Sequence, residues 1–174
     1  MPININYSKK VTNKSSSNLV LFVDEKFNII NLRKYLSNTE FSYINDLLKV
    51  SDLKKNMFVF EVNSKKKIVL ISIKKNLKNF DVENLGAELY GRINYGKNSD
   101  YFINSDSVIG KYENFIGHFL HGLKLKSYEF KKYKSKKETR IISVNVLGNR
   151  NKPSNQNQLK FKALEAGTFF ARDL

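Results

Sequence analysis

The 174-residue chain contains no cysteine and no tryptophan, and it has only two prolines. Without cysteine it forms no disulfide, offers no thiol nucleophile and binds no metal through thiolates, and this composition suits a reducing cytosol. No apolar run approaches the roughly 18 residues typical of a transmembrane helix. The first residues, MPININYSKK, have no hydrophobic stretch behind their charges, which argues against a secretory signal. These absences predict a cytoplasmic protein without a membrane partner.

Positive charge is the most conspicuous property that the chain does have. It carries 31 lysines and arginines against 16 acidic residues, a net charge of +15. Only five of the basic residues are arginine, the side chain whose planar fork suits specific recognition of phosphates and bases. Lysine is a hydrated point charge that is common on ordinary protein surfaces. We therefore interpret the charge mainly as a lysine-biased surface, with nucleic-acid binding as the alternative.

The densest basic segment is the candidate for that alternative. Its lysines are interleaved with Tyr133 and lie close to Tyr128 and Phe130, and basic residues combined with aromatic rings bind single strands by stacking. The candidate nucleic-acid-binding residues are Lys131, Lys132, Lys134, Lys136 and Lys137. The other interpretation is a charged turn that leads into a strand starting near Arg140.

Hydrophobic periodicity predicts strands and helices in alternation. Strands are expected at residues 3–7, 19–23, 57–62, 68–73, 101–103 and 141–147. Helices are expected at residues 39–49, 81–96, 112–126 and 157–174. This alternation is typical of an α/β domain with a mixed sheet that helices cover on both faces.

Two of the predicted helices have unusual features. Gly86 lies inside the helix at 81–96, where glycine costs about 1 kcal/mol relative to alanine, and we expect close packing of this helix against the sheet to offset the cost. The last helix has five apolar members, which are Leu159, Phe161, Leu164, Phe169 and Phe170. It ends at Leu174 without glycine, proline or a polar tail, which predicts a helix that continues into a second domain.

Residues able to carry out catalysis are few. The histidines, His118 and His121, stand three apart on a predicted helix, but no H-E-x-x-H motif surrounds them and no third ligand is evident. We interpret them as partly exposed surface residues. Asp100 and Asp106 are interpreted as turn and cap residues. No G-x-S-x-G elbow, dinucleotide fingerprint or phosphate-binding loop occurs. The inventory favours an accessory domain over an enzyme.

Two segments in the last third of the chain carry a family resemblance. Residues 122–138 read GLKLKSYEFKKYKSKKE, and residues 165–174 read EAGTFFARDL. In this order they resemble the bacterial type of the leucyl (cytosol) aminopeptidase family. In that family a helix ends in a G-x-x-L-x-S-Y-x-F-x-x-Y-K-like stretch, and a later A-R-D-L-like stretch lies on the helix that leads to the catalytic domain. The helix around Gly86 also looks like the first long helix of the family.

The resemblance implies a division of labour. Residues 1–154 would be the family's non-catalytic α/β domain, which is similar to macrodomains, and residues 155–174 would begin the helix linking it to an absent C-terminal catalytic domain. That domain carries two divalent metal ions, manganese or zinc, and an N-T-D-A-E-G-R-like motif that this sequence lacks. No catalytic or metal-binding residue therefore carries over, and no cofactor is expected in this chain. The implied partners are the catalytic domain, further subunits of a homo-hexamer and the peptide substrates of the parent hydrolase.

Macrodomain similarity adds a further alternative, the binding of ADP-ribose or a related nucleotide. Such a site needs glycine-rich loops that let backbone N–H groups approach a diphosphate. The glycines of this chain are spread singly and mostly within predicted helices, and only Gly148 directly follows a strand. The sequence therefore does not favour nucleotide binding.

Overall fold

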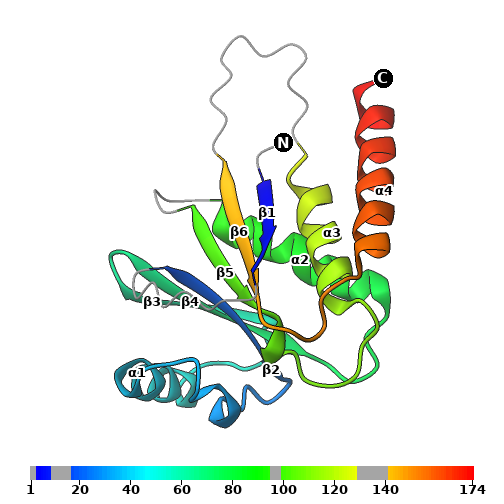
Figure 1. Cartoon of the computed structure of the whole chain (residues 1–174). Helices are drawn as coiled ribbons and strands as arrows, with labels where there is room; N and C mark the ends of the chain where they lie inside the picture. The colour runs from blue at the N-terminus through cyan, green and yellow to red at the C-terminus, as the bar shows by residue number, and fades with distance from the viewer. Residues whose placement is uncertain (1–2, 9–16, 95–98, 129–140) are drawn as a thin grey trace.

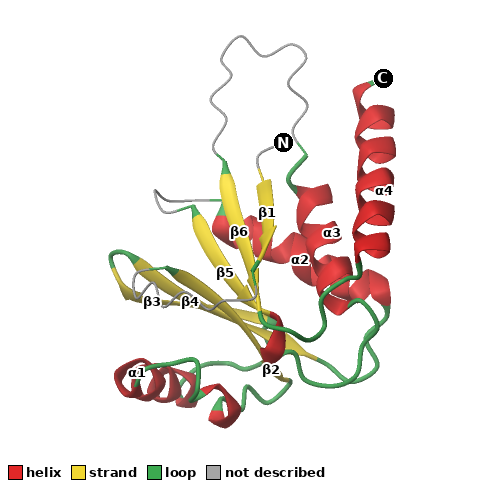
Figure 2. Cartoon of the chain, in the orientation of Figure 1, coloured by secondary structure: helices red, strands yellow, loops and turns green. Residues whose placement is uncertain are grey.

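A computed structural model describes residues 3–8, 17–94, 99–128 and 141–174. Within these residues, six strands form one sheet in the order β1-β6-β5-β2-β4-β3 (Figures 1 and 2). The strands are β1 (Ile3–Tyr7), β2 (Asn18–Asp24), β3 (Met57–Asn63), β4 (Lys66–Ile73), β5 (Asp100–Asn104) and β6 (Ile142–Leu147). The helices are α1 (Asn38–Lys49), α2 (Asn79–Ile93), α3 (Phe115–Lys126) and α4 (Asn155–Asp173), with short 3₁₀ turns at Ile30–Leu32 and Ser105–Ser107.

The sheet is mixed because one edge strand runs against the others. β3 pairs antiparallel with β4, and every other pairing is parallel. The connection between the strands expected at 57–62 and 68–73 is shorter than those bounds imply, since Asn63 pairs with Lys66 and both strands extend to the turn. The continuous apolar run of β2 is buried on both faces at the centre of the sheet, as its pattern predicts.

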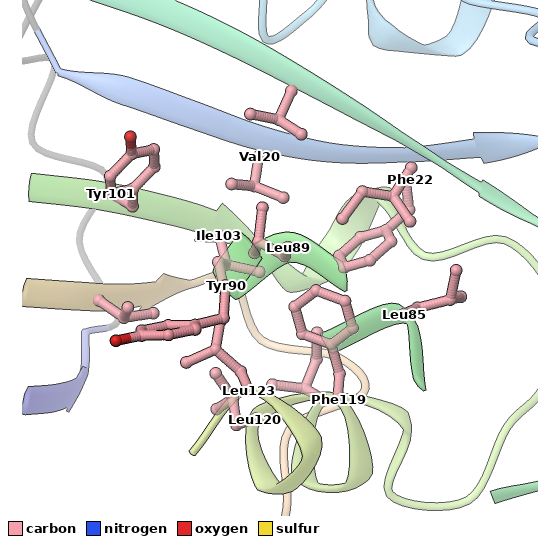
Figure 3. Close-up of a cluster of buried hydrophobic side chains, with 14 of the residues drawn as sticks. Val20, Phe22, Leu85, Leu89, Tyr90, Tyr101, Ile103, Phe119, Leu120 and Leu123 are labelled. Atoms are coloured by element: carbon pink, nitrogen blue, oxygen red, sulfur yellow. The ribbon is translucent and has the colours of Figure 1, made fainter. Parts of the chain in front are cut away.

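Helices cover both faces, which confirms the predicted α/β architecture. Helices α2 and α3 lie on one face, and α1 lies on the other beneath β2, β3 and β4 (Figure 1). The larger core joins α2 and α3 to the sheet, with Phe22 of β2 meeting Phe115 and Phe119 of α3 edge to face at ring distances of 5.2 and 5.3 Å (Figure 3). No helix in the described part of the chain is both long and apolar enough to cross a membrane.

A capping box begins helix α1, and an ion pair connects the helix to the sheet. The Ser37 hydroxyl accepts the Glu40 N–H at 3.2 Å while Glu40 accepts the Ser37 N–H at 2.9 Å, which forms a capping box. Lys66 of β4 then lies 2.6 Å from the Glu40 carboxylate. Burial opposes ionisation of Glu40, but the hydrogen bonds from Lys66 and Ser37 outweigh it and lower the pKa of this carboxyl group.

Two glycines allow α2 and α3 to touch backbone to backbone. A Cβ atom on Gly86 would overlap the carbonyl of Phe119 in α3, and one on Gly122 would overlap the carbonyl of Glu83 in α2. The contact is therefore reciprocal. The expectation that Gly86 permits close packing is right, but the partner was wrong: it is the neighbouring helix α3, not the sheet.

Replacing Gly86 with alanine should destabilise the fold by about 3 kcal/mol, because the obstacle is backbone and cannot rotate away. Gly167 in α4 is the matched control. A Cβ there meets nothing within 4 Å, so Gly167→Ala should instead stabilise the chain by about 1 kcal/mol. Urea denaturation of the two variants measures both effects. Equal free energies of unfolding for the two variants would contradict the reciprocal helix contact.

Candidate functional site

Helix α4 runs beside α3 and attaches through a single face (Figure 1). The Phe161 ring lies 5.0 Å from the His118 ring and 5.2 Å from the His121 ring. About two helical turns further on, Phe169 stacks on Tyr128 with the two ring centres 5.2 Å apart. These ring contacts define which side of α4 faces the rest of the domain.

The five apolar residues of α4 do not share one face. Phe169 is buried and Phe161 is half-buried, whereas Leu159, Leu164 and Phe170 are exposed. The spacing of the inner face is 158, 161, 165 and 169, so Glu165 rather than Leu164 points inward.

A buried ion-pair cluster joins the two helices. Glu165 of α4 is only 3% exposed, and its carboxylate receives His121 Nδ1 at 3.2 Å and Lys124 Nζ at 2.9 Å. His121 is 8% exposed, so its interpretation as a surface residue was wrong. It is buried because α4 covers this part of α3. A buried carboxylate needs such partners, since an unpaired charge loses its hydration.

The two histidines do not converge on a common ligand. His118 Nδ1 binds Glu83 of α2 at 2.8 Å, whereas His121 Nδ1 binds Glu165 of α4. Across the described ranges, no group of three or more histidine and carboxylate side chains is placed to hold a metal ion. The histidines serve instead as polar connections from α3 to the helices on its two sides.

A cavity of about 390 Å³ opens between β1, α3 and α4, next to this cluster. Tyr7 of β1 lines it together with His121, Lys124 and Glu165. Burial of the phenol, assisted by repulsion from the Glu165 carboxylate, raises the pKa of Tyr7 to about 12. A tyrosine is neutral at physiological pH even at its ordinary pKa, and the raised pKa keeps Tyr7 neutral and able to donate a hydrogen bond in mild alkali as well.

The fold has a second place where a ligand would be sought. In open α/β sheets, ligands bind beyond the carboxyl ends of the strands where the strand order reverses, which here is between β2 and β5. The turn Ser105–Ser107 fills this position. The Ser107 hydroxyl accepts the Phe22 N–H at 3.0 Å, and the Ser105 hydroxyl donates to the Leu147 carbonyl at 2.8 Å.

The loop after β6 is likewise engaged by the protein itself. Asp106 accepts the N–H groups of Asn149 and Arg150 at 3.0 and 2.8 Å, which confirms its interpretation as a turn residue. Gly148 has φ +105°, and a Cβ on it would lie 2.6 Å from the Ser105 hydroxyl. Glycine is thus required by the 105–107 turn. Two backbone amides at this end of the sheet, those of Asn149 and Arg150, therefore already bind a carboxylate.

The candidate nucleic-acid-binding lysines, Lys131, Lys132, Lys134, Lys136 and Lys137, lie outside the described residues. Their assignment stays a prediction. Two residues of this site, Glu165 and Tyr7, were not singled out from the sequence. A charged residue four positions after Phe161 and four before Phe169, on the helix face that those two rings share, is the signal that could have revealed Glu165.

Stability in alkali tests the environment of Tyr7. The pKa of Tyr7 is raised in the folded state, so the folded protein keeps the phenol proton to a higher pH than the unfolded chain does. The contribution of Tyr7 to the free energy of unfolding is therefore fully present below pH 10 and is lost as the pH rises toward 12. Tyr7→Phe should therefore make the free energy of unfolding fall less steeply between pH 10 and 12. Parallel slopes for the variant and the parent chain would show that the phenol titrates normally.

Comparison with known proteins places the fold. Neither family models nor curated proteins match this sequence. Among solved structures, a mutant of tomato leucine aminopeptidase matches 95% of this chain with a TM-score of 0.68 and 15% identity. The macrodomain of Thermus aquaticus DarG matches 84% with a TM-score of 0.54 and 10% identity, and 99% of that domain is covered. This chain spans only 36% of the tomato enzyme. It therefore has a macrodomain-like α/β fold that also forms about a third of a leucine aminopeptidase.

Proposed function

We propose that this chain is a non-catalytic accessory domain of a larger metal-dependent aminopeptidase of the leucyl type. Two observations support this proposal. The segments at 122–138 and 165–174 resemble that family in sequence, and the fold resembles about a third of the tomato enzyme over 95% of this chain. The role of such a domain is to dock on the catalytic domain and shape the assembly.

The observation that carries the proposal is an apolar stripe on the outer side of α4. It consists of Leu159, Ala163, Ala166 and Phe170, which recur at spacings of four, three and four residues and so share one side of a helix. Leu159 is 66% exposed and Phe170 is 68% exposed. Ala166 and Phe170 directly follow the buried Glu165 and Phe169, so the stripe lies about 100° round the helix from the face that packs against the domain.

An exposed stripe of this kind indicates a docking surface. A helix that buries one face against its own domain and exposes apolar residues on another face is suited to contact a second domain as well. The second body in our proposal is the catalytic domain, which would meet α4 through Leu159 and Phe170. Docking would explain why these two apolar side chains are exposed, since the fold of this domain does not bury them.

The chemistry of the parent would reside in the catalytic domain. Two divalent ions, manganese or zinc, would activate water there and polarise the scissile carbonyl of a peptide substrate. The described residues of this chain do not fit such a centre, since they bring no three ligands together. Assembly as a homo-hexamer and a cytoplasmic location belong to the same proposal for the parent.

Nucleotide binding is the competing function because of the macrodomain likeness. The turn Ser105–Ser107 and the carboxylate of Asp106 occupy the strand ends where a diphosphate would bind, which disfavours it. Nucleic-acid binding by the lysines between 131 and 137 stays an alternative that rests on sequence alone.

An activity assay tests the proposal directly. The purified 174-residue chain, supplied with Mn²⁺ or Zn²⁺, should not hydrolyse a leucine anilide, because its described residues bring no three metal ligands together and its sequence lacks the N-T-D-A-E-G-R-like motif. An antibody raised against it should detect, in extracts of the source cells, a polypeptide well above 20.2 kDa. Robust turnover by the chain alone, or a native product of its own mass, would overturn the accessory role.

Substitutions at two adjacent phenylalanines, Phe169 and Phe170, distinguish an effect on folding from an effect on docking. Phe169 is 8% exposed and stacks on Tyr128, so Phe169→Ala should cost the isolated chain about 3 kcal/mol of unfolding free energy. Phe170 is exposed, so Phe170→Ala should change that free energy by less than about 0.5 kcal/mol. In the larger protein, however, Phe170→Ala should lower the melting temperature of the assembly. If it left that temperature unchanged, the stripe would not be the docking surface.

A further inference from the structure

The two edges of the sheet are protected to different extents. Edge strands carry unpaired backbone groups, which proteins usually guard with charges or bulges. β3 has both, since Glu61 pairs with Lys67 at 2.8 Å and the register shifts between Glu61 and Asn63. β1 has neither: its residues, ININY, are uncharged, and they pair with β6 in unbroken register.

The outer side of β1 therefore offers a strand-pairing template. The Ser8 N–H donates to the Val146 carbonyl of β6 at 2.9 Å. Because backbone groups alternate along a strand, Asn4 and Asn6 also direct theirs toward β6, whereas Ile5 and Tyr7 direct theirs outward. In the described sheet β1 has β6 as its one neighbour, so the outward backbone groups of Ile5 and Tyr7 pair with no strand there.

Space for another strand lies along this edge. The cavity of about 390 Å³ is lined by all five residues of β1 on one side. On the other side α4 contributes Gln158, Phe161, Lys162 and Glu165, and α3 forms its floor. Figure 1 shows β1 as the strand next to α3 and α4, with β6 on its other side. A chain added at the ordinary spacing of about 4.8 Å would enter this groove.

Charge identifies the occupant. Lys124 and Lys162 line the groove, and its one carboxylate, Glu165, is already bound by His121 and Lys124. The chain as a whole carries an excess of 15 positive charges. A second copy of the same chain would bring like charge to this surface, whereas an acidic segment would find complementary charge.

We propose that the groove between β1 and α4 binds an extended acidic peptide segment of a partner protein, which pairs with β1 as a seventh strand. Backbone hydrogen bonds from Ile5 and Tyr7 provide the pairing, and Lys162 favours acidic side chains. The groove shares no residue with the proposed docking surface, but Lys162 lies one helical turn from Leu159 and Ala166 of the stripe.

A labelled peptide tests the pairing. The probe is a fluorescein-tagged heptapeptide in which valine and threonine alternate with aspartate and glutamate, titrated with the purified chain by fluorescence anisotropy at low salt. It should bind, and binding should weaken as salt rises. The same peptide methylated on alternate backbone nitrogens should bind at least tenfold more weakly. Absence of binding up to millimolar protein, or equal binding of the methylated peptide, would overturn strand addition.

Protein variants locate the site. Lys162→Glu should weaken binding of the acidic peptide about fivefold, whereas Lys160→Glu, on the same helix but outside the groove, should change it less than twofold. Ile5→Pro removes one outward N–H while sparing the ladder to β6, a position where an edge strand tolerates proline, and should abolish binding. The melting temperature of the Ile5→Pro variant shows whether it still folds. The comparison of the two lysine variants does not depend on this measurement.

Two further outcomes would overturn the proposal. Equal effects of Lys162→Glu and Lys160→Glu would show that the peptide responds to overall charge and not to the groove. A concentration-dependent dimer in sedimentation that Ile5→Pro abolishes would assign the edge to a second copy of this chain. Neither outcome bears on the aminopeptidase proposal, which is tested by activity and by the Phe170 variant.

Discussion

The close approach of α2 and α3 is the constraint on which the rest of this structure depends. Gly86 faces the carbonyl of Phe119, and Gly122 faces the carbonyl of Glu83, so neither helix could carry a side chain at its glycine without moving the other. Glycine in a helix is unfavourable by itself. Here the cost is offset because both helices can then cover the same face of the sheet, with Phe119 reaching Phe22 of the central strand (Figure 3).

The position of α3 in turn determines how α4 attaches. His118 faces back to Glu83 of α2, and His121 faces forward to Glu165 of α4. The ring of Phe161 contacts both imidazoles. α4 is thus held by a few specific side chains over one face only. This arrangement leaves one side of α4 as an apolar stripe and leaves a groove between its flank and β1, and each surface supports a separate binding proposal.

The fold of this domain does not by itself determine what the domain binds. The chain shares its architecture with a macrodomain and with about a third of a leucine aminopeptidase. The place where such sheets bind ligands is nevertheless closed by Ser107 on the Phe22 amide and by Asp106 on the amides of the loop after β6. Within the described residues, the surfaces for which we propose recognition are on α4 and at the edge of the sheet, and both proposals concern other polypeptides.

The sequence by itself determined the element order, the mixed sheet and the buried central strand, because hydrophobic periodicity is a local property that residues such as Leu19 to Val23 carry unaided. It also indicated that Gly86 needs a close neighbour. Only the tertiary structure decided that this neighbour is α3, that Glu165 is buried, and that Leu159 and Phe170 face outward. The physical reason is that a helical face becomes inner or outer only through what packs against it, and the α3 residue that contacts Phe161 and Glu165 of α4 is 40 to 44 residues away in the chain.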